Sequence, residues 1–160
     1  KGASVMITKL NQFIFSIIFF FLITTGLFAQ EHFTTNSVRV VSMYRTNPGQ
    51  FDAYMKYLRA NFLPQQEEAK KQGLILDYTI LLNTPSSPDD WDIAVVVVHK
   101  DFGDALDYNQ SDADKRKETM SKHYRTTDED KMREMTANRF EMRTYIGTKY
   151  FRDVTLKPLQ

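Results

Sequence analysis

The sequence WDIAVVVVHK, residues 91–100, decides the fold of this chain. Its run of β-branched residues predicts a strand. Successive side chains of a strand point to opposite faces, so the uninterrupted apolar run from Ile93 to Val98 makes both faces apolar. A strand of this kind has to be covered on both sides. We therefore expect it in the middle of a sheet, with helices over one face and a second layer, from outside the chain, over the other.

The segment before this strand predicts a helix over residues 47–73, NPGQFDAYMKYLRANFLPQQEEAKKQG. Asn47 is the expected N-cap, Pro64 is expected to kink or break the helix after residue 63, and Gly73 is expected to end it. The apolar side chains recur at spacings of three and four and so share one face: Phe51, Tyr54, Met55, Leu58 and Phe62. A strand over 74–83 and a turn-rich loop, TPSSPDD, lead on to residue 91.

The remaining elements complete an α+β pattern. A strand is expected over 37–45, a short helix after its cap Asp101, and a charged helix over 111–125. A capping box of Thr126 and Glu129 then opens a helical stripe that is expected to end at Gly147, before a last strand over 148–156. Two βαβ halves with right-handed crossovers give a ferredoxin-like βαββαβ fold. Its four-stranded antiparallel sheet has the first and third strands in the middle, helices on one face and an extended second helical region.

The N-terminal residues predict a secretory signal peptide. Lys9 precedes an apolar core, residues 13–23, which is too short for a membrane span of about 20 residues. We expect translation to start at Met6 and cleavage to follow Ala29, so that residues 1–29 are removed. An uncleaved membrane anchor is the alternative. Residues 30–36 are expected to be a flexible lead-in to a single domain over 37–158, exported to the periplasm or secreted and away from the membrane once cleaved.

Four segments carry a resemblance to a known family: VRVVSMY at 38–44, PGQFDAYMKYL at 48–58, EEAKKQGLILDY at 67–78 and WDIAVVVVH at 91–99. On these segments the chain resembles the dimeric α/β-barrel superfamily. The resemblance covers roughly residues 37–156, nearly all of the expected mature chain. It implies a homodimer in which two protomers pack their open sheet faces together, which would supply the missing layer. Members of the superfamily include cofactor-free monooxygenases, isomerases and haem-binding enzymes, so the fold alone does not choose a function.

Composition excludes several functions. The net charge is +1 and charges of both signs are mixed, so we expect no nucleic-acid partner. The chain has no cysteine, which excludes disulfides, thiolate metal sites and a cysteine nucleophile. No histidine spacing typical of a transition-metal site occurs, and we expect no metal and no cofactor. Haem binding through His99 or His123 stays open without a motif to support it.

The candidate catalytic residues are His99 and Asp77. His99 ends the apolar strand and could act as a base near neutral pH, although a histidine bonded to backbone at a strand end is the commoner case. Asp77 lies on an apolar strand face, where it is either in a pocket with a raised pKa or at a sheet edge in water. We favour water for Asp77, because its strand is predicted at the edge.

A candidate ligand pocket would be lined by aromatic side chains together with one histidine. These residues are Tyr44, Tyr78, Trp91 and His123. Core packing with polar tips at the surface explains the aromatic residues equally well, and a solvated surface position explains the histidine.

Two functions follow from these patterns. The first is an exported homodimer without catalytic activity, which binds a small apolar or aromatic molecule or serves as an interaction module. The second is a cofactor-independent monooxygenase or isomerase for a small aromatic or polyketide-like substrate, with His99 as the base. We favour the first, because the sequence carries no catalytic motif.

Overall fold

A computed structural model describes residues 32–159, which form two units. The larger, Thr35–Asp153, holds the helices, β2, β3 and most of β1 and β4. In the smaller, the described residues are 32–34 and 154–159, where the Lys157 amide donates to the His32 carbonyl. The elements in chain order are β1 Phe33–Thr46, α2 Phe51–Tyr57, the π-helical η2 Leu58–Phe62, α3 Leu63–Lys71, β2 Asp77–Leu82, β3 Ile93–His99, α4 Phe102–Leu106, α5 Gln110–Tyr124, α6 Glu129–Ala137, α7 Arg139–Met142 and β4 Arg143–Leu156.

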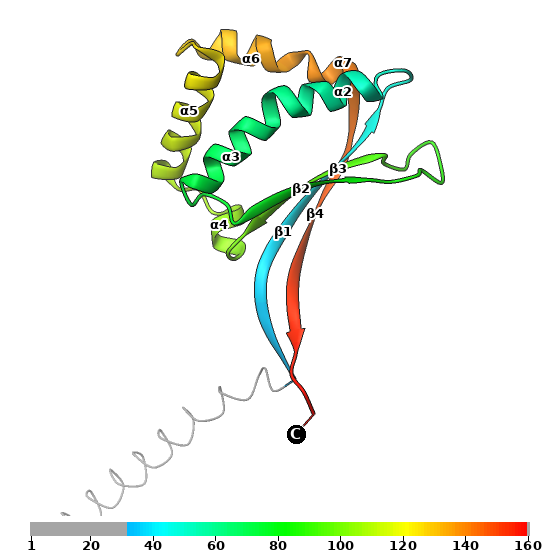
Figure 1. Cartoon of the computed structure of the whole chain (residues 1–160), viewed down its shortest axis with the longest axis vertical. Coiled ribbons are helices and arrows are strands. Elements are labelled where there is room, and N and C mark those ends of the chain that lie inside the picture. The colour runs from blue at the N-terminus through cyan, green and yellow to red at the C-terminus, as the bar shows by residue number, and fades with distance from the viewer. Residues whose placement is uncertain (1–31, 160) are drawn as a thin grey trace, which may run out of the picture. The chain divides into compact units, whose positions relative to one another are not determined.

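The four strands form one sheet in the order β2-β3-β1-β4 (Figure 1). Strand β3 pairs antiparallel with β1, where Val40 lies opposite Val97, and antiparallel with β2, where Ile80 lies opposite Val95. The α+β class and the four-stranded antiparallel sheet are therefore confirmed. The first and third strands are central and the second is at an edge, as the sequence predicts.

One face of the sheet carries the core. Tyr54 of α2 and Leu58 of η2 are buried against Ile93 and Val95 of β3. A second buried cluster joins Ala69 of α3 to Leu74 and Ile75, just before β2. Figure 1 shows α2, α3, α6 and α7 on this side of the sheet. The apolar face predicted for the helix over residues 47–73 thus packs on β3, the apolar strand.

The opposite face differs from the expectation of a required second layer. Ala94 is 0% exposed and Val96 only 2% exposed within the single chain, and each lies between paired residues of β1 and β2. Exposed apolar side chains remain on β2 and on the edge strand β4. Leu81, opposite Ala94, is 44% exposed and Phe151 of β4 is 48% exposed. Ala94 and Val96 therefore need no further cover, whereas the exposed apolar side chains Leu81 and Phe151 would be stabilised by it.

The helix begins later than predicted, and Asn47 is not its cap. The Gln50 amide donates to the Asn47 carbonyl, and Gly49 between them has φ +76°, so residues 47–50 form a turn. A Pro-Gly pair favours such a turn, since Pro sets φ of its first central residue and Gly accepts a positive φ at the second. Asn47 instead donates from its side chain to the Glu141 carbonyl, which ties the turn to α7. The left-handed helix end at Gly73, φ +71°, is confirmed.

The predicted break near Pro64 occurs one turn earlier. Residues Leu58–Phe62 form a π-helical turn, and α3 then starts with Pro64 in its first turn. Pro64 has no N–H to donate, and its ring would clash with the carbonyl of residue 60 in a regular helix. Widening the preceding turn removes both conflicts without ending the helix.

The second helical region is divided into more pieces than the pattern suggests. Asp101 caps α4 as predicted, by accepting from the Asp104 amide at 2.9 Å. The Thr126 and Glu129 box is wrong, because Asp128 is the N-cap of α6 and accepts from two amides. The predicted stop at Gly147 is also wrong: α7 ends at Met142 and Gly147 lies inside β4.

Two further expectations concern the N-terminus. Residues 33–36, expected in a flexible lead-in, belong to β1. The expected signal segment 1–29 lies outside the described residues. Within the described part, 32–159, no helix is both long enough and apolar enough to cross a membrane.

The burial pattern predicts which leucines of η2 and α3 stabilise the fold. Leu58 is 3% exposed against β3, and Leu63 is 42% exposed. Leu58→Ala should lower the free energy of unfolding by about 2–5 kcal/mol, because it leaves a cavity in the core. Leu63→Ala is the matched control and should change it by about 0.5 kcal/mol or less. Urea unfolding measures both, and equal effects would contradict this packing.

Candidate ligand-binding pocket

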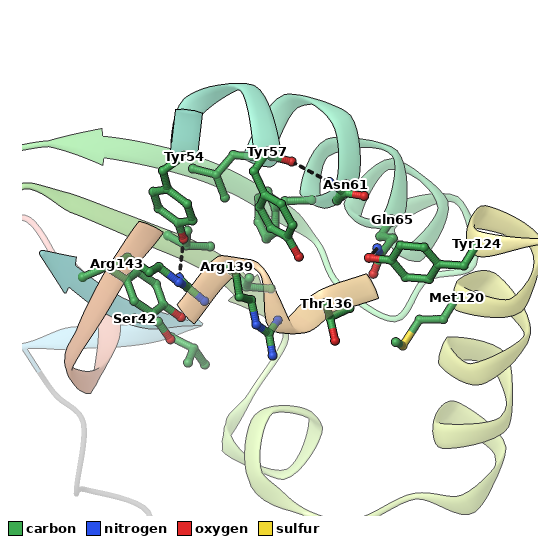
Figure 2. Close-up of a pocket in the computed structure, with 16 residues that line it drawn as sticks. Ser42, Tyr54, Tyr57, Asn61, Gln65, Met120, Tyr124, Thr136, Arg139 and Arg143 are labelled. Atoms are coloured by element: carbon green, nitrogen blue, oxygen red, sulfur yellow. Dashed lines mark hydrogen bonds between the residues drawn. The ribbon is translucent and has the colours of Figure 1, made fainter. Parts of the chain in front are cut away.

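A cavity of about 450 Å³ lies between the sheet and the helices. Its floor comes from β1 and β3, and its walls come from α2, η2, α3, α5, α6, α7 and the start of β4 (Figure 2). The lining residues are Val40, Ser42, Tyr44, Tyr54, Tyr57, Leu58, Asn61, Phe62, Gln65, Val95, Val97, Met120, Tyr124, Thr136, Arg139 and Arg143. Four tyrosines, two arginines and no carboxylate are among them. The cavity size is in the range of small-molecule sites.

Arg143 joins three elements at one end of the pocket. Its Cζ lies 3.4 Å from the centre of the Tyr44 ring of β1 and 4.8 Å from that of Tyr54 of α2. It also donates from Nη1 to the Tyr54 hydroxyl (Figure 2). A guanidinium over an aromatic face is stabilised by the ring quadrupole, more strongly where water is excluded. Arg143 is therefore held by π contacts and a phenol, without a carboxylate partner among the described residues.

Arg139 contributes a second guanidinium. Figure 2 shows its side chain between those of Arg143 and Thr136 in this view. Its Nε is buried and has no hydrogen-bond partner among the described residues. Its Cζ lies 5.2 Å from the neighbouring Phe140 ring, and no described carboxylate lies within ion-pair distance. A buried donor without a partner is costly, so Arg139 has unused capacity to bind.

The tyrosines present neutral hydroxyls to the cavity. Burial raises the pKa of Tyr54 well above its ordinary value, and the charge of Arg143 offsets only part of this. Burial likewise raises the pKa of Tyr124. Both therefore remain phenols at neutral pH. Because the Tyr54 oxygen accepts from Arg143, its own proton is available to a ligand.

Amide side chains close the far end of the pocket. Gln65 Nε2 donates to the Tyr124 hydroxyl at 3.4 Å. Asn61 Nδ2 donates to the Tyr57 carbonyl at 3.2 Å, and its Oδ1 lies 3.2 Å from His123 Nε2. The contacts of Tyr124 and His123 connect α5 to α3 and η2. The only charged side chains in the lining are the two arginines.

Of the aromatic residues proposed from sequence, only Tyr44 lines this cavity. Tyr78 packs edge-on against Phe62, with ring centres 5.8 Å apart, and its hydroxyl donates to Glu67 near the surface. Glu67 raises the pKa of Tyr78 to about 12. Trp91 precedes β3 in the loop, and its carbonyl accepts from Asn83. Tyr78 and Trp91 thus hold other parts of the fold.

His123 lies beside a separate hollow of about 410 Å³. Its lining is Pro64, Gln65, Glu68, Thr119, Lys122 and His123. The imidazole packs edge-on against Tyr124, with ring centres 4.7 Å apart, and meets Asn61. His123 therefore supports the tyrosine that lines the larger cavity without lining that cavity itself.

The structure does not bring His99 and Asp77 together. Asp77 lies opposite Val98 and His99 opposite Val38, so the two side chains point to opposite faces of the sheet. Asp77 is exposed and paired with Lys70 at 2.7 Å, which lowers its pKa. This agrees with the favoured reading of Asp77 as an edge residue in water. His99 is buried, its Nδ1 has no partner among the described residues, and it does not line the cavity.

Most of the polar side chains that line the cavity are not predicted by the sequence patterns. Arg139 carried a signal, since it is the one charge in the stripe that includes Met132, Met135 and Met142. No sequence signal marked Arg143, Tyr57 or Tyr124, because their roles depend on contacts between elements that are distant in the sequence. Between residues 32 and 159 no group of three or more His, Asp or Glu side chains is arranged to hold a metal ion.

Comparison with known proteins gives no match: no family model, curated protein or solved structure is significantly similar to the chain.

The buried His99 predicts a pH dependence of stability. Burial lowers its pKa, the charge of Arg116 lowers it further, and Asp104 raises it slightly. The unfolded chain therefore binds this proton more readily than the fold does. The free energy of unfolding should fall as pH drops through about 6.5 and level off below the pKa of the folded state. His99→Gln should reduce this slope. A proton NMR titration of His99 with a midpoint at or above that of a free imidazole would contradict the assignment.

Proposed function

We propose that this chain is an exported, homodimeric, ferredoxin-like domain of the dimeric α/β-barrel type that binds a small aromatic molecule between its sheet and its helices. The observation that carries the proposal is the cavity of about 450 Å³ lined by Tyr44, Tyr54, Tyr57 and Tyr124. Tyrosines offer flat apolar surfaces with hydroxyls that fix the orientation of a ligand.

The aromatic contacts favour a rigid, planar ligand. Tyr54 and Tyr57 stack with an interplanar angle of 13° and ring centres 6.2 Å apart, while Tyr44 meets Tyr54 edge-on at 6.2 Å. Because these rings are already held by one another and by Arg143, little side-chain ordering remains to be done on binding. Preorganisation of this kind lowers the entropic cost of capturing a ligand.

The fold part of the proposal is supported by topology. Strand order β2-β3-β1-β4, with a helical connection between β1 and β2 and another between β3 and β4, is what two right-handed βαβ units produce in a ferredoxin-like domain. The segments that resemble the superfamily fall on β1, the start of α2, the end of α3 and β3. Export rests on the N-terminal sequence alone.

The homodimer is proposed through the sheet face that carries no helices. Its centre is apolar, with Val96 and Met43 among others, and its flanks expose Leu81 and Phe151. Its rim carries charges of both signs, such as Arg39 bound to Asp153 at 2.9 Å. An apolar centre with a polar rim is typical of interfaces. A second copy is the favoured partner because a rim with both signs can face itself across a two-fold axis.

A cofactor-independent monooxygenase or isomerase is the second candidate. Its proposed base, His99, lies outside the cavity and away from Asp77. The aromatic cavity fits the substrate class of that candidate as well as it fits a ligand that is only bound. We rank it second because no group suited to act as a base near neutral pH lines the cavity.

The binding function predicts that filling the cavity abolishes binding. Thr136 of α6 lines the cavity, and its neighbour Met135 is 49% exposed. Thr136→Trp should block binding of 2-naphthoate, 2-naphthamide and 2-naphthol in isothermal titration calorimetry. Met135→Trp adds the same side chain outside the cavity and should leave binding unchanged.

Two results would count against this function. Absence of heat with all three probes would contradict aromatic binding. Protein-dependent oxygen uptake with a quinol such as 1,4-dihydroxynaphthalene, lost in His99→Gln, would favour the second candidate.

The homodimer predicts a mass of two chains in light scattering at micromolar concentration. Leu81→Lys would place a charge in the proposed interface and should shift the mass to one chain. Leu106→Lys is the matched control, since Leu106 of α4 is 56% exposed and lies outside the proposed interface. A single-chain mass for the unsubstituted protein would remove the dimer from the proposal and leave the pocket unaffected.

A further inference from the structure

We infer that the ligand carries an anionic group, a carboxylate on an aromatic ring, and that Arg139 with Arg143 binds it. The inference rests on the proposed binding function and specifies its ligand class. It starts from a charge imbalance: the cavity lining holds two guanidinium groups and no Asp or Glu.

The imbalance has an energetic consequence. A charged side chain taken out of water is stabilised by an opposite charge, and a site that keeps two cations without one favours an incoming anion. Two other arginines of the described chain have such partners, both at the surface: Arg39 binds Asp153 at 2.9 Å and Arg133 binds Asp130 at 3.2 Å. Arg139 and Arg143 differ from these in facing the cavity.

The two arginines have different roles. Arg143 is fixed between Tyr44 and Tyr54, so its guanidinium plane is held in place before a ligand arrives. Arg139 keeps a buried Nε without a partner. A carboxylate accepts two parallel hydrogen bonds from one guanidinium, and Arg139 has the donors for that pairing.

The neutral groups around the arginines suit the same ligand. Tyr54 stays protonated because of its burial, and it can donate its proton to an anion. In Figure 2, Thr136 lies beside Arg139 and Tyr57 lies above it. The apolar floor of Val40, Val95 and Val97 can take the ring. An anion at the arginines with a flat body over the valines uses each part of the lining.

The test compares two probes of equal shape and different charge. Isothermal titration of the full mature chain with 2-naphthoate should give an affinity at least about tenfold higher than with 2-naphthamide, because charge-assisted hydrogen bonds are stronger than neutral ones. Arg139→Gln should remove this preference. Arg133→Gln, on the exposed side of α6, should retain it. Among residues 32–159 the Arg139 side chain forms no ion pair or hydrogen bond and packs on the Phe140 ring, so thermal unfolding of Arg139→Gln should stay close to that of the unsubstituted protein.

The outcomes separate the two proposals. Equal affinity for naphthoate and naphthamide, unaffected by Arg139→Gln, overturns the anion inference and leaves aromatic binding intact. A preference for naphthoate that survives in Arg139→Gln and in Arg143→Gln also overturns it, because the charge would then be recognised elsewhere. Failure of both probes to bind contradicts the proposed function itself and removes the inference with it.

Discussion

Burial of β3 on both faces is the constraint from which the other elements take their places. Ile93 and Val95 need cover on one side, which Tyr54 and Leu58 provide. Ala94 and Val96 are buried on the other side, between the paired strands β1 and β2. These two requirements fix β3 in the centre and place the first helix over it. Tyr54 and Leu58 also line the cavity, so the residues that cover β3 form part of its wall.

The π-helical turn reconciles this packing with Pro64. The continuous helical segment α2-η2-α3 lines the cavity with residues at spacings of four, including Tyr57, Asn61 and Gln65. A proline in the middle of a regular helix would break this stripe. The widened turn over Leu58–Phe62 absorbs the conflict, so that Gln65 still faces the cavity and meets Tyr124 of α5. The irregular turn thereby connects a backbone requirement to the shape of the pocket.

Local patterns predicted most of the architecture. The apolar run at 93–98 gave a central strand, Asp101 gave a cap, and Gly73 gave a helix end, because each depends on neighbouring residues alone. The prediction of Asn47 as N-cap was wrong because a Pro-Gly turn competes with capping. In the structure the Asn47 side chain instead binds the distant carbonyl of Glu141.

The pocket was harder to predict for the same reason. The sequence made Tyr44 a candidate pocket residue, and the predicted edge position of its strand favoured water for Asp77. Sequence spacing does not show which helix faces which strand, so it could not bring Tyr124 or Arg143 to Tyr44.

The boundary between α7 and β4 carries the functional consequence. The helical stripe that includes Arg139 and Met142 continues in pattern to Ile146, yet the helix stops at Met142 because the following residues pair with β1. If the helix continued past Met142, Arg139 and Arg143 would lie one turn apart on the same face of that helix. The change from helix to strand between them instead places Arg143 against Tyr44 while Arg139 also lines the cavity. Pairing of β4 with β1 therefore brings the two cations to one cavity, although no carboxylate lines it.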